Sequence, residues 1–102
     1  MHYLLFYDVI ADYVERRVPL RAAHLSYARR AVDDGVLILG GALADPVDGA
    51  VLLFRADSRG TVEQFAAADP YVLNGLVKSW RVREWTTVVG TEAARPADPA
   101  SV

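Results

Sequence analysis

Hydrophobic side chains cluster in four short runs along this chain, at residues 2–10, 36–43, 50–56 and 78–89. Each run is rich in aliphatic, β-branched and aromatic residues, which favours strands. Apolar residues in the two longer stretches between runs recur every three or four positions, a spacing typical of a helix with one buried face. The pattern therefore predicts the element order βαββαβ.

Proline and glycine residues set the expected boundaries of the first helix and of the central hairpin. A helix over residues 19–34 would carry Pro19 in its first turn and stop at Gly35. Residues 12–17 are polar and charged, so we expect a connecting loop there. Residues 45–49, DPVDG, predict a turn that joins the second and third strands into a hairpin.

The second helix has candidate signals at both ends. We expect it to begin at Ser58 or Thr61, and Gln64 lies at the capping-box spacing from Thr61. Pro70 disfavours helical geometry in the residue before it, so the helix should end at Asp69. Asp69 is also a good N-cap for a new short turn with Pro70 at its first position.

This element order indicates an α+β, ferredoxin-like domain, in which a four-stranded antiparallel sheet carries two helices on one face. The first three strands are apolar on both sides, yet two helices can cover only one face. An exposed apolar face of that size is uncommon on a monomer, so we expect a homodimer, a dimeric α/β barrel formed through the open sheet face. The domain should span residues 1–90, and residues 91–102 should form a flexible tail.

Composition argues against several classes of partner and cofactor. The net charge is -2, from 13 acidic and 11 basic residues, which leaves no basic excess for nucleic acid. Cysteine is absent, and His2 and His24 are too far apart for metal-ligand spacing, so we expect neither a metal nor another cofactor. No run approaches the ~18 apolar residues of a membrane span, so we expect a cytoplasmic protein that does not bind membranes.

Two residues stand out as candidate chemical groups, although each also has a purely structural explanation. His24 lies at the centre of the predicted buried face of the first helix, where a neutral core histidine is common. Asp69 is equally well explained as a helix cap. The other members of the helix face are Leu20, Ala23, Tyr27 and Ala31.

Other polar and glycine positions receive simpler interpretations. Surface charge is the simplest reading of four arginines in and before the first helix, namely Arg16, Arg17, Arg29 and Arg30. The pair Gly40-Gly41 inside the second strand predicts a bulge or a close approach to the backbone. His2, near the chain start, is expected to be exposed.

Three segments resemble the YCII-related (YciI-like) family. They are Arg21-Ala22-Ala23-His24-Leu25, Asp34-Gly35-Val36-Leu37 and Ala68-Asp69-Pro70-Tyr71-Val72, the last followed by Gly75. The resemblance extends from residue 1 to about residue 89, and the spacing of the histidine and Asp-Pro-Tyr segments is its most specific feature. Ala22 and Ala42 depart from the family pattern, which often has proline in those places.

The resemblance implies a dimeric ferredoxin-like protein with an active site centred on a histidine and an aspartate. By position, the catalytic pair is His24 and Asp69. Asp33 is a rival for the aspartate, but it lies nine residues after His24 and faces the opposite side of the helix. The expected substrate contacts are Arg21, Tyr71 and Gly41.

A histidine beside a carboxylate is a general acid–base pair, and no G-x-S-x-G motif indicates an acyl-enzyme. The expected reactions are therefore proton transfers, such as isomerisation, elimination or hydrolysis of a small acidic or lactone substrate. Some proteins similar to this one dehalogenate a chlorinated hydroxymuconolactone, in which a base removes a proton and chloride leaves. A non-catalytic small-molecule-binding or accessory domain and a cofactor-free monooxygenase are the alternatives.

Overall fold

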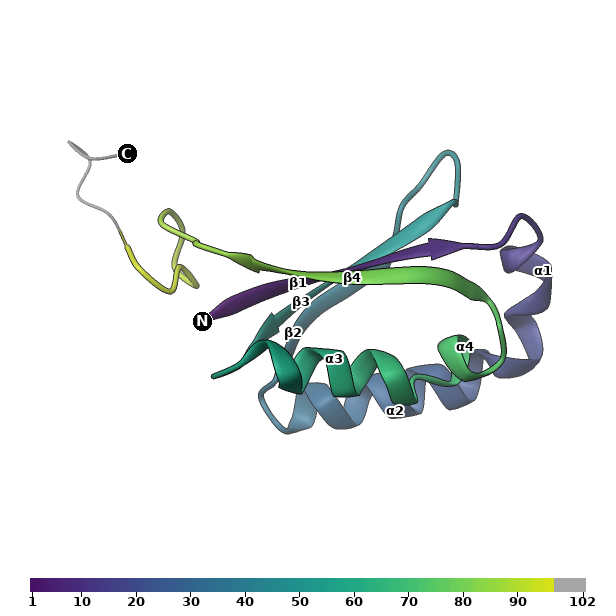
Figure 1. The fold of residues 1–102 in the computed structure, drawn as a ribbon, viewed down its shortest axis with the longest axis horizontal. Coiled ribbons are helices and arrows are strands. Elements are labelled where there is room, and N and C mark those ends of the chain that lie inside the picture. Colours follow the sequence, from purple (N-terminus) through teal and green to yellow (C-terminus); the bar gives the residue numbers. More distant parts are fainter. Residues whose placement is uncertain (97–102) are drawn as a thin grey trace.

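A four-stranded antiparallel sheet forms the centre of the molecule (Figure 1). The computed structural model describes residues 1–96 of the 102-residue chain. The strand order is β2-β3-β1-β4, and each neighbouring pair is antiparallel. The strands are β1 (His2–Val9), β2 (Leu37–Ala42), β3 (Gly49–Arg55) and β4 (Val77–Trp85).

The main helices lie together on one face of this sheet (Figure 1). They are α2 (Arg21–Asp33) and α3 (Arg59–Ala68), accompanied by the short helices α1 (Tyr13–Arg16) and α4 (Pro70–Leu73). The Tyr27 hydroxyl of α2 donates to the Phe65 carbonyl of α3 at 2.8 Å, so the two long helices are in contact. This arrangement confirms the predicted α+β, ferredoxin-like fold.

The core lies between the sheet and the helices. Alternate residues of β1, Tyr3, Leu5 and Tyr7, are buried on this side, as the two-residue period of a strand requires. Phe54 of β3 is fully buried among them. Gly49 is needed beside Tyr7, because a Cβ there would lie 2.8 Å from the Tyr7 carbonyl oxygen.

The opposite face of the sheet is open among residues 1–96 and apolar at its centre, while Arg81 and Arg83 of β4 lie on its edge opposite Phe6 and Leu4. Leu4 and Phe6 of β1 pair with Leu53 and Val51 of β3, and these four side chains are only half-buried. Leu39 of β2, opposite Leu53, is 70% exposed. No described helix covers this face (Figure 1).

Several predicted local features are wrong. Residues 12–17 contain helix α1, because Tyr13 turns into the core and is buried. Of the two predicted starts of α3, Ser58 is confirmed as the N-cap residue, so Thr61 lies inside that helix and the predicted capping box is wrong. The irregular pairing of β2 falls between Leu37 and Leu39, before the glycine pair, but the alternative prediction of a close approach is confirmed at Gly40, where a Cβ would lie 3.2 Å from Leu52 Cγ. The last strand ends at Trp85 rather than at residue 89.

The segment after β4 folds back on the start of the chain. His2 is buried, not exposed as expected, and its Nδ1 forms a hydrogen bond with the Thr87 hydroxyl. The Arg55 guanidinium donates to Glu92 at 2.7 Å, so part of the predicted tail contacts the sheet. Residues 97–102 of that tail lie outside the described residues. Within residues 1–96, every helix is too short or too polar to span a membrane.

Candidate active site

Asp69 occupies the junction between α3 and α4. Pro70 forces the residue before it out of helical geometry, and Asp69 is extended, with φ -63° and ψ 128°. Its Oδ1 accepts a hydrogen bond from the Tyr71 backbone N–H at 2.9 Å and so caps α4, as predicted. This cap fixes the direction of the carboxylate.

Two further side chains bind the same carboxylate, which has no exposed surface. The Tyr7 hydroxyl donates to Oδ2 at 2.8 Å, and His24 Nδ1 lies 2.8 Å from Oδ1. Burial, together with the neighbouring Asp69 carboxylate, raises the pKa of Tyr7 far above its ordinary value, so this hydroxyl stays a donor. Three donors thus offset the desolvation of one buried carboxylate.

His24 is held in a fixed orientation on α2. Its ring stacks on the Tyr71 ring with centroids 3.8 Å apart and planes 7° apart. An ionised carboxylate only accepts hydrogen bonds, so the shared proton belongs to His24 Nδ1. Nε2 then carries a lone pair in the neutral ring. It forms no hydrogen bond within residues 1–96, and the His24 side chain, which is 15% exposed, lines the cavity.

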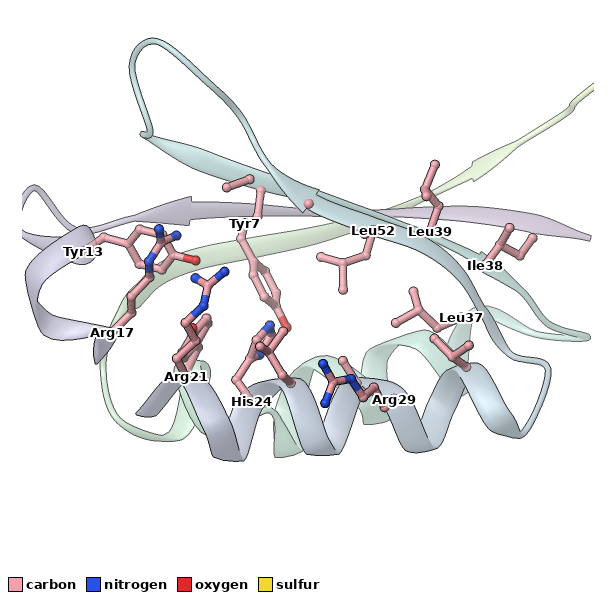
Figure 2. A pocket seen from close by; sticks show the side chains of 18 residues that line it. Tyr7, Tyr13, Arg17, Arg21, His24, Arg29, Leu37, Ile38, Leu39 and Leu52 are labelled. Atoms are coloured by element: carbon pink, nitrogen blue, oxygen red, sulfur yellow. The ribbon is translucent and has the colours of Figure 1, made fainter. Parts of the chain in front are cut away.

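A cavity of about 360 Å³ lies between α2 and the β2 edge of the sheet (Figure 2). Tyrosine, arginine and histidine side chains gather at one end, from Tyr13 to His24 (Figure 2). Leu37, Leu39 and Leu52 make the other end apolar. The volume suits a small organic molecule with both polar and apolar parts.

The structure places each predicted site residue. Arg21, Tyr71 and Gly41 line the cavity, as His24 does, while Asp69 lies behind His24. Asp33 is exposed at the end of α2 and does not line the cavity. The catalytic and binding roles of these residues stay predictions.

The predicted buried face of α2 is only partly confirmed, since Tyr27 and Ala31 are partly buried against the core. Ala23 is exposed, and none of the residues of α2 is fully buried. Leu25 and Val32 line the cavity, and Ala28 both lines it and packs against the core. The cavity exists because β2 and α2 do not close on one another at this edge.

Four residues of the site were missed in the sequence. Tyr7 shares the inward parity of Tyr3 and Leu5, and a buried tyrosine hydroxyl requires a partner, which was the available signal. Arg17 and Arg29, interpreted in the sequence only as surface charge, line the cavity, and Arg29 is also exposed. Their signal is the spacing of Arg17 four residues before Arg21 and of Arg29 eight residues after it. Tyr13 lies within residues 12–17, which were predicted to form a loop.

The profile of the YCII-related domain matches residues 1–86. The chain belongs to the YCII-related family. Two relatives are the Protein YciI of Escherichia coli O6:H1 and that of Shigella flexneri. Each is 28% identical to this chain over 97 residues, which is 86% of this chain and 99% of the relative.

Solved structures show the same fold for this YCII-related domain. One is the 5-chloro-2-hydroxyhydroquinone dehydrochlorinase TftG of Burkholderia phenoliruptrix AC1100, in complex with 2,5-dihydroxybenzoquinone. It is 24% identical, has a TM-score of 0.73, and the match covers 85% of this chain and 95% of TftG. Protein Atu4242 of Agrobacterium tumefaciens has a TM-score of 0.52 at 13% identity, over 92% of this chain and 98% of that one.

Proposed function

We propose that this YCII-related protein is a proton-transfer enzyme that acts on a small acidic or lactone substrate without a cofactor. The observation that carries the proposal is the bond between His24 Nδ1 and the buried Asp69 carboxylate, which leaves Nε2 facing a cavity. A buried acceptor fixes the tautomer of the imidazole, and a fixed tautomer presents an unprotonated nitrogen to the substrate.

The chemistry that suits this pair is the removal of a proton from carbon. His24 Nε2 takes the proton, and the electrons of the C–H bond form a double bond as a leaving group departs with its own electron pair. When the leaving group is chloride, the products are an unsaturated compound, chloride and the protonated base. Asp69 orients the ring and stabilises the positive charge that His24 acquires.

The comparison with TftG supports an elimination of this kind, because that neighbour is a dehydrochlorinase with the same fold. The stacked Tyr71 ring also keeps His24 in one rotamer, which is the preorganisation that a general base requires. Isomerisation would use the same first step, followed by return of the proton to another atom of the substrate.

The test is an assay of purified protein on 5-chloro-2-hydroxyhydroquinone and on a panel of chlorinated and unchlorinated lactones, with chloride release and absorbance followed together. For any compound that the native protein converts, His24→Ala should abolish turnover. Asp69→Asn should lower kcat by about 10²–10⁴-fold, as in other histidine–carboxylate pairs. Ser26→Ala is the matched control, since Ser26 is exposed on the same helix.

Conversion that survives His24→Ala at the native rate would show that the assignment is wrong. Binding of panel members without any conversion would instead favour the non-catalytic binding domain. Consumption of oxygen during turnover would favour the monooxygenase alternative.

A further inference from the structure

The charges around the cavity are of one sign. Among the 18 residues that line it, the charged ones are Arg17, Arg21 and Arg29, and none is Asp or Glu. The whole chain has a net charge of -2. The chain as a whole is negatively charged, so the positive charge of the cavity comes from the placement of these three arginines.

The three guanidinium groups have no carboxylate partner within residues 1–96. The ion pairs there join His24 with Asp69 and Arg55 with Glu92. The Arg17 guanidinium lies over the Tyr13 ring, 5.1 Å from its centroid, which occupies a face of the group and leaves its N–H donors free. Like charges in one cavity repel one another, and an anionic ligand would remove that repulsion.

The arginines flank His24 on both sides. Arg17 and Arg21 lie toward the start of α2, and Arg29 lies on the far side of His24 (Figure 2). At about 1.5 Å per residue, Arg21 is about 4.5 Å before His24 along the helix axis and Arg29 about 7.5 Å after it. The imidazole therefore sits between two separate cationic positions.

Tyrosine hydroxyls complete the first of these positions. Tyr13 and Tyr71 line the cavity, and neither hydroxyl has a protein partner within residues 1–96 or is fully buried. Burial raises the pKa of Tyr71, while the charges of Arg21 and Arg17 act in the opposite direction. Two guanidinium groups and two O–H donors can surround one carboxylate or enolate.

We propose that the cavity binds a small dianion, with one acidic group between Arg17 and Arg21 and the second on Arg29, so that the carbon skeleton crosses His24. This proposal names the substrate class of the same site and rests on the proposed function for the reaction that follows binding. The apolar side chains of Leu37 and Leu52 would contact the skeleton. Arg17 and Arg29 thereby become specificity-determining residues.

Isothermal titration calorimetry with three probes tests the proposal: trans,trans-muconate, its monomethyl ester and its dimethyl ester. We expect affinity to fall in that order. Arg17→Ala and Arg29→Ala should each weaken diacid binding about tenfold, the size expected for a partly solvated charge-assisted contact. With Arg29→Ala, the diacid should lose its advantage over the monoester.

The chain offers matched controls, because Arg16 and Arg30 are the immediate neighbours of Arg17 and Arg29 and do not line the cavity. Arg16→Ala and Arg30→Ala should leave diacid affinity within about twofold of the native value. Arg29→Lys should recover part of the loss, because it keeps the charge but not the planar group. Circular dichroism melts of every variant establish that it folds.

A diacid that binds no better than its diester overturns the proposal, and so does absence of measurable binding by the diacid. Equal effects of the cavity variants and their neighbours overturn it as well. The proposed function fails on a different measurement. Turnover that survives His24→Ala would contradict the proposed reaction, while the diacid affinity measured by calorimetry would be unaffected. His24-dependent turnover without preference for the diacid would remove this inference alone.

Discussion

His24 divides its two ring nitrogens between the protein and the cavity. Nδ1 is committed to Asp69 at 2.8 Å, and the Asp69 carboxylate has no exposed surface, so water does not compete for this bond. Tyr7 and the Tyr71 backbone hold the carboxylate from two other directions. The orientation of the imidazole thus depends on residues from β1, α2, α4 and the junction between α3 and α4.

Tyr7 is the member of this network whose contribution can be measured without a substrate. Tyr7→Phe leaves Asp69 Oδ2 buried without its O–H donor, so the free energy of unfolding should fall by about 1–3 kcal/mol. Tyr3→Phe is the matched control, because Tyr3 is also buried on β1 but its hydroxyl makes no hydrogen bond within residues 1–96. Urea denaturation of both variants provides the comparison.

A loss of stability that is the same for Tyr7→Phe and Tyr3→Phe would contradict the role assigned to the Tyr7 hydroxyl. The reason is physical, since both changes remove one oxygen from a ring buried on β1, and of the two hydroxyls it is that of Tyr7 that binds Asp69. The comparison therefore isolates that bond from the packing of the ring.

The elements were largely predictable from the sequence, whereas the contacts between them were not. Strand and helix order follows from local periodicity, and the Asp69-Pro70 pair marks a helix end by backbone sterics alone. The bond between Tyr7 and Asp69 depends on how β1 and α3 pack, which no local pattern encodes. His24 and Asp69 were paired through family resemblance, not through physical reasoning.

The arginines illustrate the same limit at the level of one helix. A charged side chain on a helix is solvated in most proteins, so the spacing of Arg17 and Arg29 from Arg21 was too weak a signal to assign them a role. Their role depends on the gap between α2 and β2, and that gap is a property of tertiary packing. The spacing of apolar residues in α2 likewise did not predict that none of its residues is fully buried.

The segment after β4 is an element whose attachment should depend on pH. His2 is 2% exposed, and burial lowers its pKa below the ordinary value, with the Arg55 charge acting in the same direction. The unfolded chain therefore binds more protons than the folded chain as the pH falls below about 6.5. The free energy of unfolding should decrease over that range, by at most about 1.4 kcal/mol per pH unit for one proton.

Urea denaturation at pH 7, 6 and 5 measures this dependence. His2→Gln cannot be protonated, so the decrease in its unfolding free energy should be smaller than that of the native protein. His24 is present in both proteins and its contribution cancels in the comparison. Identical pH dependence in the two proteins would show that burial of His2 does not control the stability of this end of the sheet.

At the scale of the whole molecule, the open face of the sheet is the main unpaired surface of residues 1–96 (Figure 1). Leu4, Phe6, Val51 and Leu53 form its centre, and all are half-buried. Leu39 and Trp85 extend it, with 70% and 47% of their surfaces exposed. We propose that a second copy of the chain covers this face, because a sheet buried on both sides removes the cost of hydrating these side chains.

Size-exclusion chromatography with light scattering tests the dimer directly. The native protein should have the mass of two 11.2 kDa chains, and Leu53→Glu should have the mass of one, since it places a charge at the centre of the proposed interface. Leu73→Glu is the matched control, because Leu73 is 68% exposed on α4, on the helix side of the sheet. It should remain a dimer.

A native protein that is monomeric at about 100 μM, a concentration at which even a micromolar dimer would form, would exclude this assembly. The result also bears on the cavity, because Leu39 and Gly41 belong both to its β2 edge and to the open face, where they pair with Leu53 and Val51. If the second copy packs there, Leu53→Glu should also change diacid affinity, although Leu53 does not line the cavity. Calorimetry of the monomeric variant then shows whether a single chain forms the complete binding site.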